Sequence, residues 1–302
     1  MRKEQQTIEN NTKKYWVWLS LIRDLGAIKK QKLLKHFKTV ENLYNATKEE
    51  LIQISGIGEK TAEIILNKNI KLNVYKHIEY MLKNNIEIIS IEDKEYPSLL
   101  KQIYDAPISL YIRGDKSILN NNALAIIGCR ECTDYGRNIT KSLAYYIAKN
   151  KITIVSGLAK GIDGIAHKGA LLAGEKTIAV LGNGLDTIYP AENMALAKEI
   201  LQKGGAIISE YPLGERPQRQ NFPERNRIVS GMSKGVIVVE AKKKSGTLIT
   251  VDFALEQGRD VFVVPGNINS ETSEGTNDLI KQGAKLITNY EDVLEEYKKE
   301  NI

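Results

Sequence analysis

Residues 124–173 of the chain read LAIIGCRECTDYGRNITKSLAYYIAKNKITIVSGLAKGIDGIAHKGALLA. Apolar runs at 124–127 and 152–155 each end in a glycine turn, and the residues between about Asp134 and Lys149 predict a helix. Two buried strands joined by a helix of this length form a right-handed parallel crossover, which brings both glycine turns to the carboxyl edge of one sheet. Helix N-termini at that edge present backbone N–H groups and a partial positive charge, so the stretch predicts a phosphate site.

The alternation of strands and helices continues toward the C-terminus. Apolar runs predict strands at 177–181, 207–209, 236–239, 261–264 and 286–287. Between and after them, helices are predicted at 193–203, 223–232, 247–257 and 276–282, with a last helix from Tyr290. Residues 123–302 therefore predict an α/β domain with a doubly wound, mainly parallel sheet.

The region before this sheet predicts a small helical domain. Residues 1–13 are polar and are expected to be disordered, and residues 14–70 have helical periodicity. Within them, residues 54–62 resemble the helix-hairpin-helix motif, in which Gly56 and Gly58 let the backbone approach a DNA phosphate, with Lys60 beside them. Residues 25–30 form a degenerate copy. A glycine turn between two helices is also ordinary architecture, so a structural and a DNA-binding interpretation both stand.

Residues 71–122 are expected to be a linker and a capping segment of the sheet domain, with a helix at 71–85 and a short strand at 87–91. Residues 96–100 and 106–114 are expected to supply the capping segment and an edge strand packed on the main sheet. The asparagine run at 120–122 marks where the sheet domain starts.

Composition narrows the class of protein. No apolar run approaches the roughly 18 residues of a membrane span, and the N-terminus is too polar for a signal peptide, so we expect a cytoplasmic protein without a membrane partner. The net charge is +6, but residues 123–302 carry 23 basic and 22 acidic side chains. Nucleic-acid binding by the sheet domain would therefore need a local cluster of cations.

The two cysteines, Cys129 and Cys132, have a spacing that formally matches a redox or half-metal motif. A zinc site would need further ligands, and the three histidines are scattered along the chain. We predict no disulfide framework, no metal and no redox role for this pair.

The turns at the predicted sheet edge carry cations. The chain has no P-loop sequence, which excludes a P-loop ATPase on motif grounds, and the turn at Gly128 lacks the further glycines of a dinucleotide fingerprint. Each cation alone is typical of a solvated surface, but several at one edge predict a phosphate-binding trough. These residues are Arg130, Lys160, the Arg225–Arg227 triplet and the Ser245-Gly246-Thr247 turn behind three lysines.

These motifs together resemble the DprA/Smf family of DNA-processing proteins. The resemblance covers about residues 15–290, with the motifs in the family's order. They are Gly128-Cys129-Arg130, residues 156–167, residues 179–190, Phe222-Pro223-Glu224-Arg225-Asn226-Arg227-Ile228, and Glu240-Ala241 with residues 245–250.

The resemblance implies an extended Rossmann-like domain preceded by a small all-α helix-hairpin-helix (SAM-like) domain. It implies a homodimer that binds and protects single-stranded DNA and loads the RecA recombinase on it during natural transformation. Because the predicted trough offers mostly cations, glycines and hydroxyls, we also predict no cofactor and no catalytic turnover. Cys129 stands where the family more often has serine, a change that keeps the size and a weak donor. Because the chain ends soon after Tyr297, we expect no C-terminal winged-helix domain.

The family's first-turn arginine matches Arg130, its serine-glycine turn matches Ser156 and Gly157, and its arginine-asparagine-arginine triplet matches residues 225–227. Together with the sheet-edge turns, the resemblance implies a set of DNA contacts. The expected contacts are Arg130, Ser156, Gly157, Lys160, Arg219, Arg225, Asn226, Arg227, Gly246 and Thr247, with Gly56, Gly58 and Lys60 as a possible secondary contact.

An enzyme is the main alternative. The sheet and the turn at Ser245 also resemble nucleotide phosphoribohydrolases of the lysine-decarboxylase-like group, whose turn motif carries a catalytic glutamate. Thr250 occupies the place of that glutamate, and Lys244 and Ser245 replace small turn residues. No acid therefore stands where a ribosyl cation would need it. A nucleotide-binding sensor without catalysis is a third interpretation.

Overall fold

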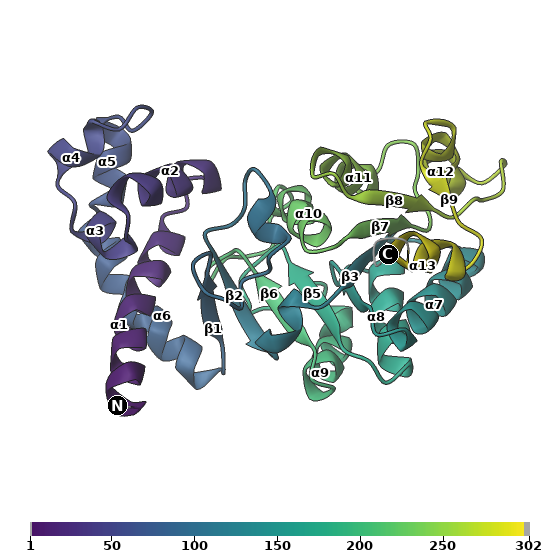
Figure 1. Cartoon of the computed structure of the whole chain (residues 1–302), viewed down its shortest axis with the longest axis horizontal. Coiled ribbons are helices and arrows are strands. Elements are labelled where there is room, and N and C mark those ends of the chain that lie inside the picture. The colour runs from purple at the N-terminus through teal and green to yellow at the C-terminus, as the bar shows by residue number, and fades with distance from the viewer. Residues whose placement is uncertain (1, 299–302) are drawn as a thin grey trace.

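The computed structural model describes residues 2–298, with side chains from residue 12 to residue 297. A helical domain comes first and packs at one end of a large sheet that is covered by helices on both faces (Figure 1). No helix within residues 2–298 is long and apolar enough to cross a membrane. The helices of the first domain are α1 (Arg2–Leu21), α2 (Ala27–Phe37), α3 (Val40–Asn45), α4 (Lys48–Ile52), α5 (Glu59–Ile65) and α6 (Lys68–Lys83).

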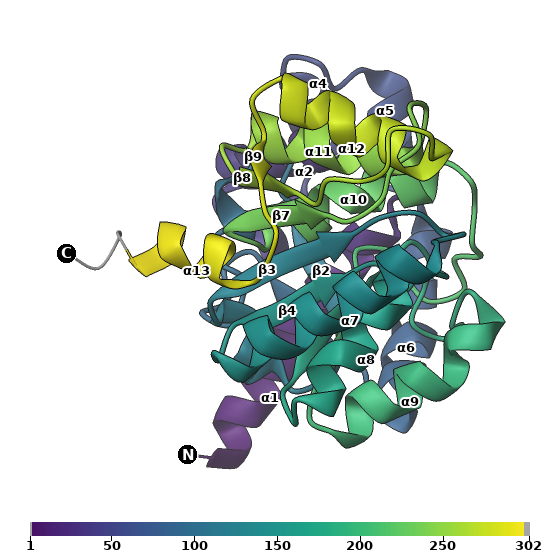
Figure 2. The ribbon, with the colours of Figure 1, turned by 90° about the vertical axis from the view of Figure 1, so that its right-hand side faces the viewer.

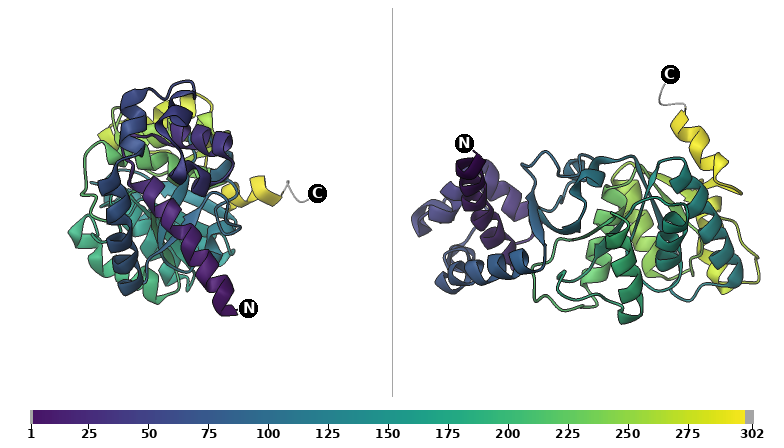
Figure 3. Two further views of the ribbon diagram at one scale, coloured as in Figure 1. Left: turned by 90° about the vertical axis from the view of Figure 1, so that its left-hand side faces the viewer. Right: turned by 90° about the horizontal axis from the view of Figure 1, so that it is seen from below.

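The helical domain is organised around α1, which packs against α3 and α6 (Figure 3). Trp18 of α1 and Ile22 directly after this helix are fully buried, and the Trp18 ring meets the Tyr44 ring edge-on at a centroid distance of 5.0 Å. Side-chain caps stabilise the short helices: Thr39 accepts an N–H at the start of α3, and Thr47 forms a capping box at the start of α4.

The sheet has nine strands within the described residues, in the order β1-β2-β6-β5-β4-β3-β7-β8-β9. The pairs β1–β2 and β2–β6 are antiparallel and the other neighbours are parallel. The strands are β1 (Glu87–Ser90), β2 (Ser109–Gly114), β3 (Ala123–Ile127), β4 (Thr153–Ser156), β5 (Thr177–Leu181), β6 (Ala206–Ser209), β7 (Gly235–Val238), β8 (Asp260–Val263) and β9 (Lys285–Leu286).

Every residue of β3 to β7 is buried, as expected for parallel strands covered on both faces. Figure 2 shows the three layers, with α7, α8 and α9 on one side of the strands and α10, α11 and α12 on the other. These helices are α7 (Asp134–Lys149), α8 (Ile162–Leu172), α9 (Met194–Gln202), α10 (Asn221–Gly231), α11 (Gly246–Glu256) and α12 (Glu271–Lys281), followed by α13 (Glu291–Lys298).

The strand order reverses at β3. From β3 the chain winds through β4 and β5 to β6, and it then returns to place β7 on the other side of β3. The connections after β3 and β7 consequently leave on opposite faces of the sheet. Such a switch point opens a crevice at the carboxyl ends of the two strands.

The predicted α/β sheet and the helical domain in front of it are confirmed. Two boundaries differ from the sequence analysis. Helix α1 begins at Arg2, so the prediction of disorder is wrong for residues 2–13, where lysine, glutamate and glutamine favour a solvated helix. Helix α6 buries Val74 and Met81 in the helical domain, which extends that domain beyond residue 70. Strands β1 and β2 lie at one edge of the sheet, next to β6.

Candidate nucleic-acid interface

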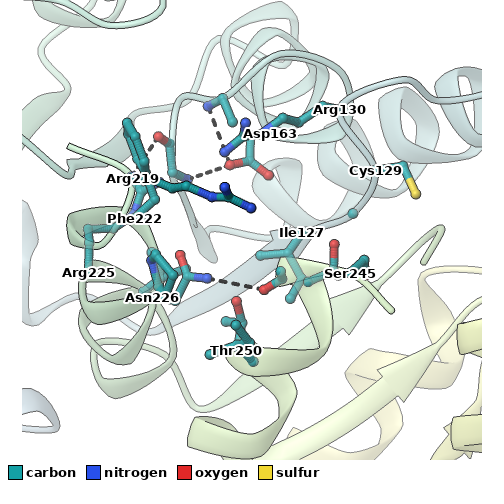
Figure 4. A pocket seen from close by; sticks show the side chains of 18 of the residues that line it. Ile127, Cys129, Arg130, Asp163, Arg219, Phe222, Arg225, Asn226, Ser245 and Thr250 are labelled. Carbon is teal, nitrogen blue, oxygen red and sulfur yellow. Dashed lines mark hydrogen bonds between the residues drawn. The ribbon is translucent and has the colours of Figure 1, made fainter. Parts of the chain in front are cut away.

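A pocket of about 810 Å³ lies at the switch point, at the carboxyl ends of β3 and β7 (Figure 4). Its walls come from the turns after β3, β4 and β7, from the segment before α10, and from α10 and α11. Its lining includes residues 128–131, Gly157, Asp163, Tyr189, Pro217, Arg219, Phe222, Arg225, Asn226, Lys242, residues 245–247 and Thr250.

The rim of the pocket, formed by Arg130, Arg219 and Lys242, is cationic and exposed. Lys242 Nζ lies 3.0 Å from Glu271 Oε2. Among the side chains from residue 12 to residue 297, no acidic group forms an ion pair with Arg130 or Arg219. Both guanidinium groups are therefore free to exchange solvent counterions for phosphates.

Two aromatic rings lie beside the rim. The rings of Tyr189 and Phe222 are 5.4 Å apart between centroids and tilted by 33°, and the guanidinium carbon of Arg130 is 5.7 Å from the centre of the Phe222 ring. Aromatic faces next to cations form a platform on which unpaired bases stack. The sequence analysis did not select these two residues as contacts. The sequence offered a reason to select them, because each stands directly before a proline in a motif quoted above.

The floor of the pocket, formed by Gly157, Asp163 and Arg225, is buried. Arg225 Nη1 donates to the carbonyl oxygen of Gly157 at 2.7 Å and to that of Val180, and Asp163 Oδ2 accepts the Gly157 N–H at 3.1 Å. A Cβ at Gly157 would lie 2.6 Å from Arg225 Nη2 and 2.7 Å from Asp163 Oδ2, so this position requires glycine.

The two charged groups of the floor affect each other's ionisation. Burial lowers the pKa of Arg225 to about 10, and the attraction of Asp163 opposes that change. Burial raises the pKa of Asp163, whereas the Arg225 guanidinium and the N–H groups of Ala159 and Gly157 hold it down. The floor is therefore a hydrogen-bonded charged unit that supports the turn after β4.

The N-terminus of α11 closes another side of the pocket. Asn226 Nδ2 donates to the carbonyl oxygen of Gly246 at 3.3 Å, which ties α10 to this turn. Nothing lies within 4 Å of a Cβ built at Gly246, so the backbone there is open to a ligand. Ser245 Oγ is buried and has no hydrogen-bond partner in the described residues. The positive end of the helix dipole therefore faces the pocket beside Ser245, which Figure 4 places below Arg130 and Arg219.

Comparison with known proteins identifies the family. The model of the family described as DNA recombination-mediator protein A matches residues 87–298, and a helix-hairpin-helix motif matches residues 17–68. The chain belongs to the DprA/Smf family.

Relatives and solved structures agree with this assignment. Protein Smf of Synechocystis sp. is 38% identical over 92% of this chain and 71% of its own length, and Protein Smf of Escherichia coli is 43% identical over 81% and 65%. The chain thus spans just under two thirds of the E. coli relative. DNA processing protein A (DprA) of Streptococcus pneumoniae superposes with a TM-score of 0.78 at 38% identity, covering 94% of this chain and 97% of that one.

A structure of DNA processing protein A from Helicobacter pylori, reported for its single-stranded DNA binding mode, superposes with a TM-score of 0.65 at 35% identity. It covers 71% of this chain and 96% of that one.

The structure brings seven of the ten predicted DprA/Smf contacts to the pocket and leaves three outside its lining. Ser156 is fully buried, and its Oγ donates to the Ile126 carbonyl oxygen at 2.7 Å, where it joins β4 to β3. Lys160 is exposed but pairs with Glu192. The residues in the lining are Arg130, Gly157, Arg219, Arg225, Asn226, Gly246 and Thr247.

Arg227 is the third residue outside the pocket lining. Its guanidinium is buried against Asp105 Oδ2 at 2.8 Å and Glu210 Oε2 at 2.8 Å. The expectation that Arg227 shares one trough with Arg130 is therefore wrong. The reason is that Arg225 and Arg227 point to different sides of α10, because residues two positions apart on a helix do not share a face.

The helix-hairpin-helix turn has the geometry expected for its glycines. Gly56 has φ +87°, Gly58 precedes α5 without a side-chain cap, and Lys60 is exposed. A Cβ built at either glycine would meet nothing within 4 Å. This turn is an open backbone surface, and DNA contact through it stays a prediction.

Cys129 and Cys132 are free thiols, and burial raises the pKa of each. Within the described residues no group of three or more histidine, cysteine, aspartate or glutamate side chains is arranged to hold a metal ion. A raised pKa disfavours the reactive thiolate. The structure thus offers no support for a redox or zinc function of this pair.

Proposed function

We propose that the chain binds single-stranded DNA in the switch-point pocket and, as a homodimer in the cytoplasm, protects incoming strands and loads the RecA recombinase on them during natural transformation. The observation that carries the proposal is the pairing of two exposed arginines, which form no ion pair with a described acidic side chain, with two aromatic rings at one crevice. Arginines bind the phosphates and the rings accept unstacked bases.

The pocket favours a single strand over a duplex. Base pairs in a duplex are stacked on their neighbours, so their faces cannot reach Phe222 and Tyr189 without unstacking. The phosphates of a splayed strand can instead bind Arg130 and Arg219 together, with a further phosphate at the N-terminus of α11. The binding mode reported for the H. pylori protein, whose fold this chain shares, supports this choice.

The proposal assigns no catalytic turnover to the pocket. Hydrolysis of a nucleotide would need a positioned acid, base or nucleophile that reaches the reacting atom. The Asp163 carboxylate, the acid of the floor, accepts N–H groups of Gly157 and Ala159, and Thr250 stands where the related hydrolases carry glutamate. Cations and amides hold phosphate without cleaving it.

Recombinase loading follows from a strand held at its phosphates on an open platform. A homodimer presents two such pockets, and the effective concentration of the second pocket makes binding to long strands tighter than binding to short ones. The family description as a recombination mediator supports this role.

The decisive experiment titrates the full chain with a labelled oligonucleotide and with the matching mononucleotide, and it assays both for release of base or phosphate. The proposal predicts tight, salt-dependent oligonucleotide binding, weak mononucleotide binding and no product.

The proposal also predicts faster RecA filament formation on strands coated with single-strand-binding protein. Tight mononucleotide binding without turnover would indicate a sensor. Turnover lost in an Asp163→Asn variant, without stimulation of filaments, would indicate the enzyme.

A further inference from the structure

The segment between β6 and α10, residues 210–220, lies between the helical domain and the pocket. On one side it provides Pro217 and Arg219 to the pocket lining. On the other side Glu215 is buried against Arg23, which lies in the turn between α1 and α2. The segment has no regular secondary structure, and Gly214 within it has φ +83°.

The Arg23–Glu215 contact is a two-pronged ion pair. Arg23 Nη2 donates to Glu215 Oε1 at 2.7 Å, and Arg23 Nη1 donates to Oε2. Glu215 Oε1 also accepts Gln218 Nε2 at 2.7 Å and Asn221 Nδ2 at 3.3 Å. One buried carboxylate therefore links the turn after α1, the segment and the first residue of α10.

The helical domain holds this segment at further points. His77 Nε2 of α6 lies 3.2 Å from the carbonyl oxygen of Leu213. The buried Lys30 of α2 interacts electrostatically with Glu210. The segment is thus held from the side that faces away from the pocket, at its beginning and in its middle.

We propose that Arg23 is a positioning residue for DNA binding. Through Glu215 it fixes residues 210–220, so that Arg219 is already placed at the rim before DNA binds. The inference rests on the proposed function, because it assumes that the pocket binds DNA. Arg23 is not part of the pocket lining and acts through Glu215. A segment that is ordered before binding loses less conformational freedom when the strand arrives. The helical domain is consequently coupled to the affinity of a pocket on the sheet domain.

The test measures binding of a labelled oligo-dT by the full chain at several salt concentrations. We expect Arg23→Ala to weaken binding about tenfold without changing the salt slope, because Arg219 still reaches its phosphate and only the cost of ordering residues 210–220 is added. Arg219→Ala should weaken binding and reduce the log–log slope by about 0.7. In the Arg219→Ala background, Arg23→Ala should cost less than about twofold, because both residues act through one contact. Lys48→Ala, which removes an ion-paired lysine of the same helical domain, is the matched control and should bind normally.

A second measurement needs no DNA. Hydrogen exchange at residues 211–220 should accelerate in Arg23→Ala and stay unchanged in Lys48→Ala. If Arg23→Ala alone unfolds the chain, the double variant Arg23→Ala with Glu215→Gln takes its place in both measurements, because it leaves no unpaired carboxylate buried at residue 215.

The inference would be overturned by additive effects of Arg23→Ala and Arg219→Ala on binding, or by a reduced salt slope in Arg23→Ala. It would also be overturned if Arg23→Ala bound normally while Arg219→Ala bound more weakly, or if hydrogen exchange in Arg23→Ala were unchanged. Normal binding by Arg219→Ala and Arg130→Ala together would instead overturn the proposed function, and the exchange measurement would still decide whether Arg23 orders the segment.

Discussion

The rim and the floor of the pocket carry the same type of residue in opposite environments. Arg130 and Arg219 on the rim are exposed and form no ion pair with a described acidic side chain, whereas Arg225 on the floor is 4% exposed. The buried guanidinium donates to two backbone carbonyl oxygens and faces Asp163. Arginine at a sheet edge therefore has two functions here, and burial decides which one a given arginine has.

The difference has a physical origin in desolvation. A guanidinium removed from water needs fixed partners, and once it has them it is not available to a ligand. An exposed guanidinium keeps its solvent counterions and exchanges them for phosphates. Substitutions on the floor should therefore change stability, and substitutions on the rim should change binding and its salt dependence.

The largest effect is expected for Arg225→Ala. The substitution leaves the Asp163 carboxylate buried without its opposing charge and removes the donor to the Gly157 and Val180 carbonyl oxygens. Breaking a buried charged pair from one side costs about 3–5 kcal/mol. Urea denaturation at pH 7 should show this loss in the free energy of unfolding, with Arg219→Ala within about 0.5 kcal/mol of the parent. A loss below about 1 kcal/mol in Arg225→Ala would remove the distinction between rim and floor.

The second effect is a loss of stability in acid that comes from His167, which lies behind the floor. Its Nδ1 is 2.8 Å from Thr177 Oγ1, and burial, reinforced by the Arg225 charge, lowers its pKa to about 3. The unfolded chain takes up this proton near pH 6.5 and the folded chain does not. The free energy of unfolding should therefore fall as the pH drops below 6.5, by about 2 kcal/mol at pH 4.5.

The measurement is urea denaturation between pH 7 and pH 4.5 for the parent and for His167→Asn, which keeps a donor near Thr177. The variant should lose less stability over this range than the parent. Parallel curves for the two proteins would show that His167 does not stay neutral in the folded state.

The order of elements was predictable because each strand has its own apolar run and each turn its own glycine. The predicted helix at 134–149 is confirmed, since Thr133 caps it and Lys149 ends it. The N-terminal end of α12 was missed by five residues. Glu271 to Gly275 carry no large apolar side chain, so periodicity could not reveal this first turn of the helix. Close packing holds it in place, with Gly275 against the backbone of Ala241 and Lys242 and Ser273 against Gly266.

The position of the site in the fold was also predictable from the sequence. Which arginines are exposed to a ligand and which are buried as structural residues was not. Strand order and turn chemistry bring Arg130 and Arg225 to the same edge. Whether a guanidinium reaches solvent depends on partners far away in sequence, such as Asp105 for Arg227 and Gly157 for Arg225. The tie from Arg23 to Glu215 joins residues 192 positions apart, and no local pattern predicts it.

A smaller effect, confined to binding, is expected on the rim. Arg130→Ala should weaken the binding of single-stranded DNA about five- to tenfold for every base sequence, because phosphates carry no sequence information. The log–log salt slope should decrease by about 0.7. Titrations with oligonucleotides of different sequence at several salt concentrations, together with urea denaturation, would check this. Unchanged slope with reduced stability would mean that Arg130 belongs functionally to the floor.

The smallest effect is expected for Lys160→Ala, and it tests whether exposure at the sheet edge is sufficient for binding. Lys160 follows β4 as Arg130 follows β3, and both are exposed, but Lys160 pairs with Glu192 and is not part of the pocket lining. An exposed ion pair contributes little to stability, so the variant should fold normally. Its affinity for oligo-dT should stay within about twofold of the parent and its salt slope should not change. A decrease in slope equal to that of Arg130→Ala would show that the strand leaves the pocket along α8, and the rim would then have to include Lys160.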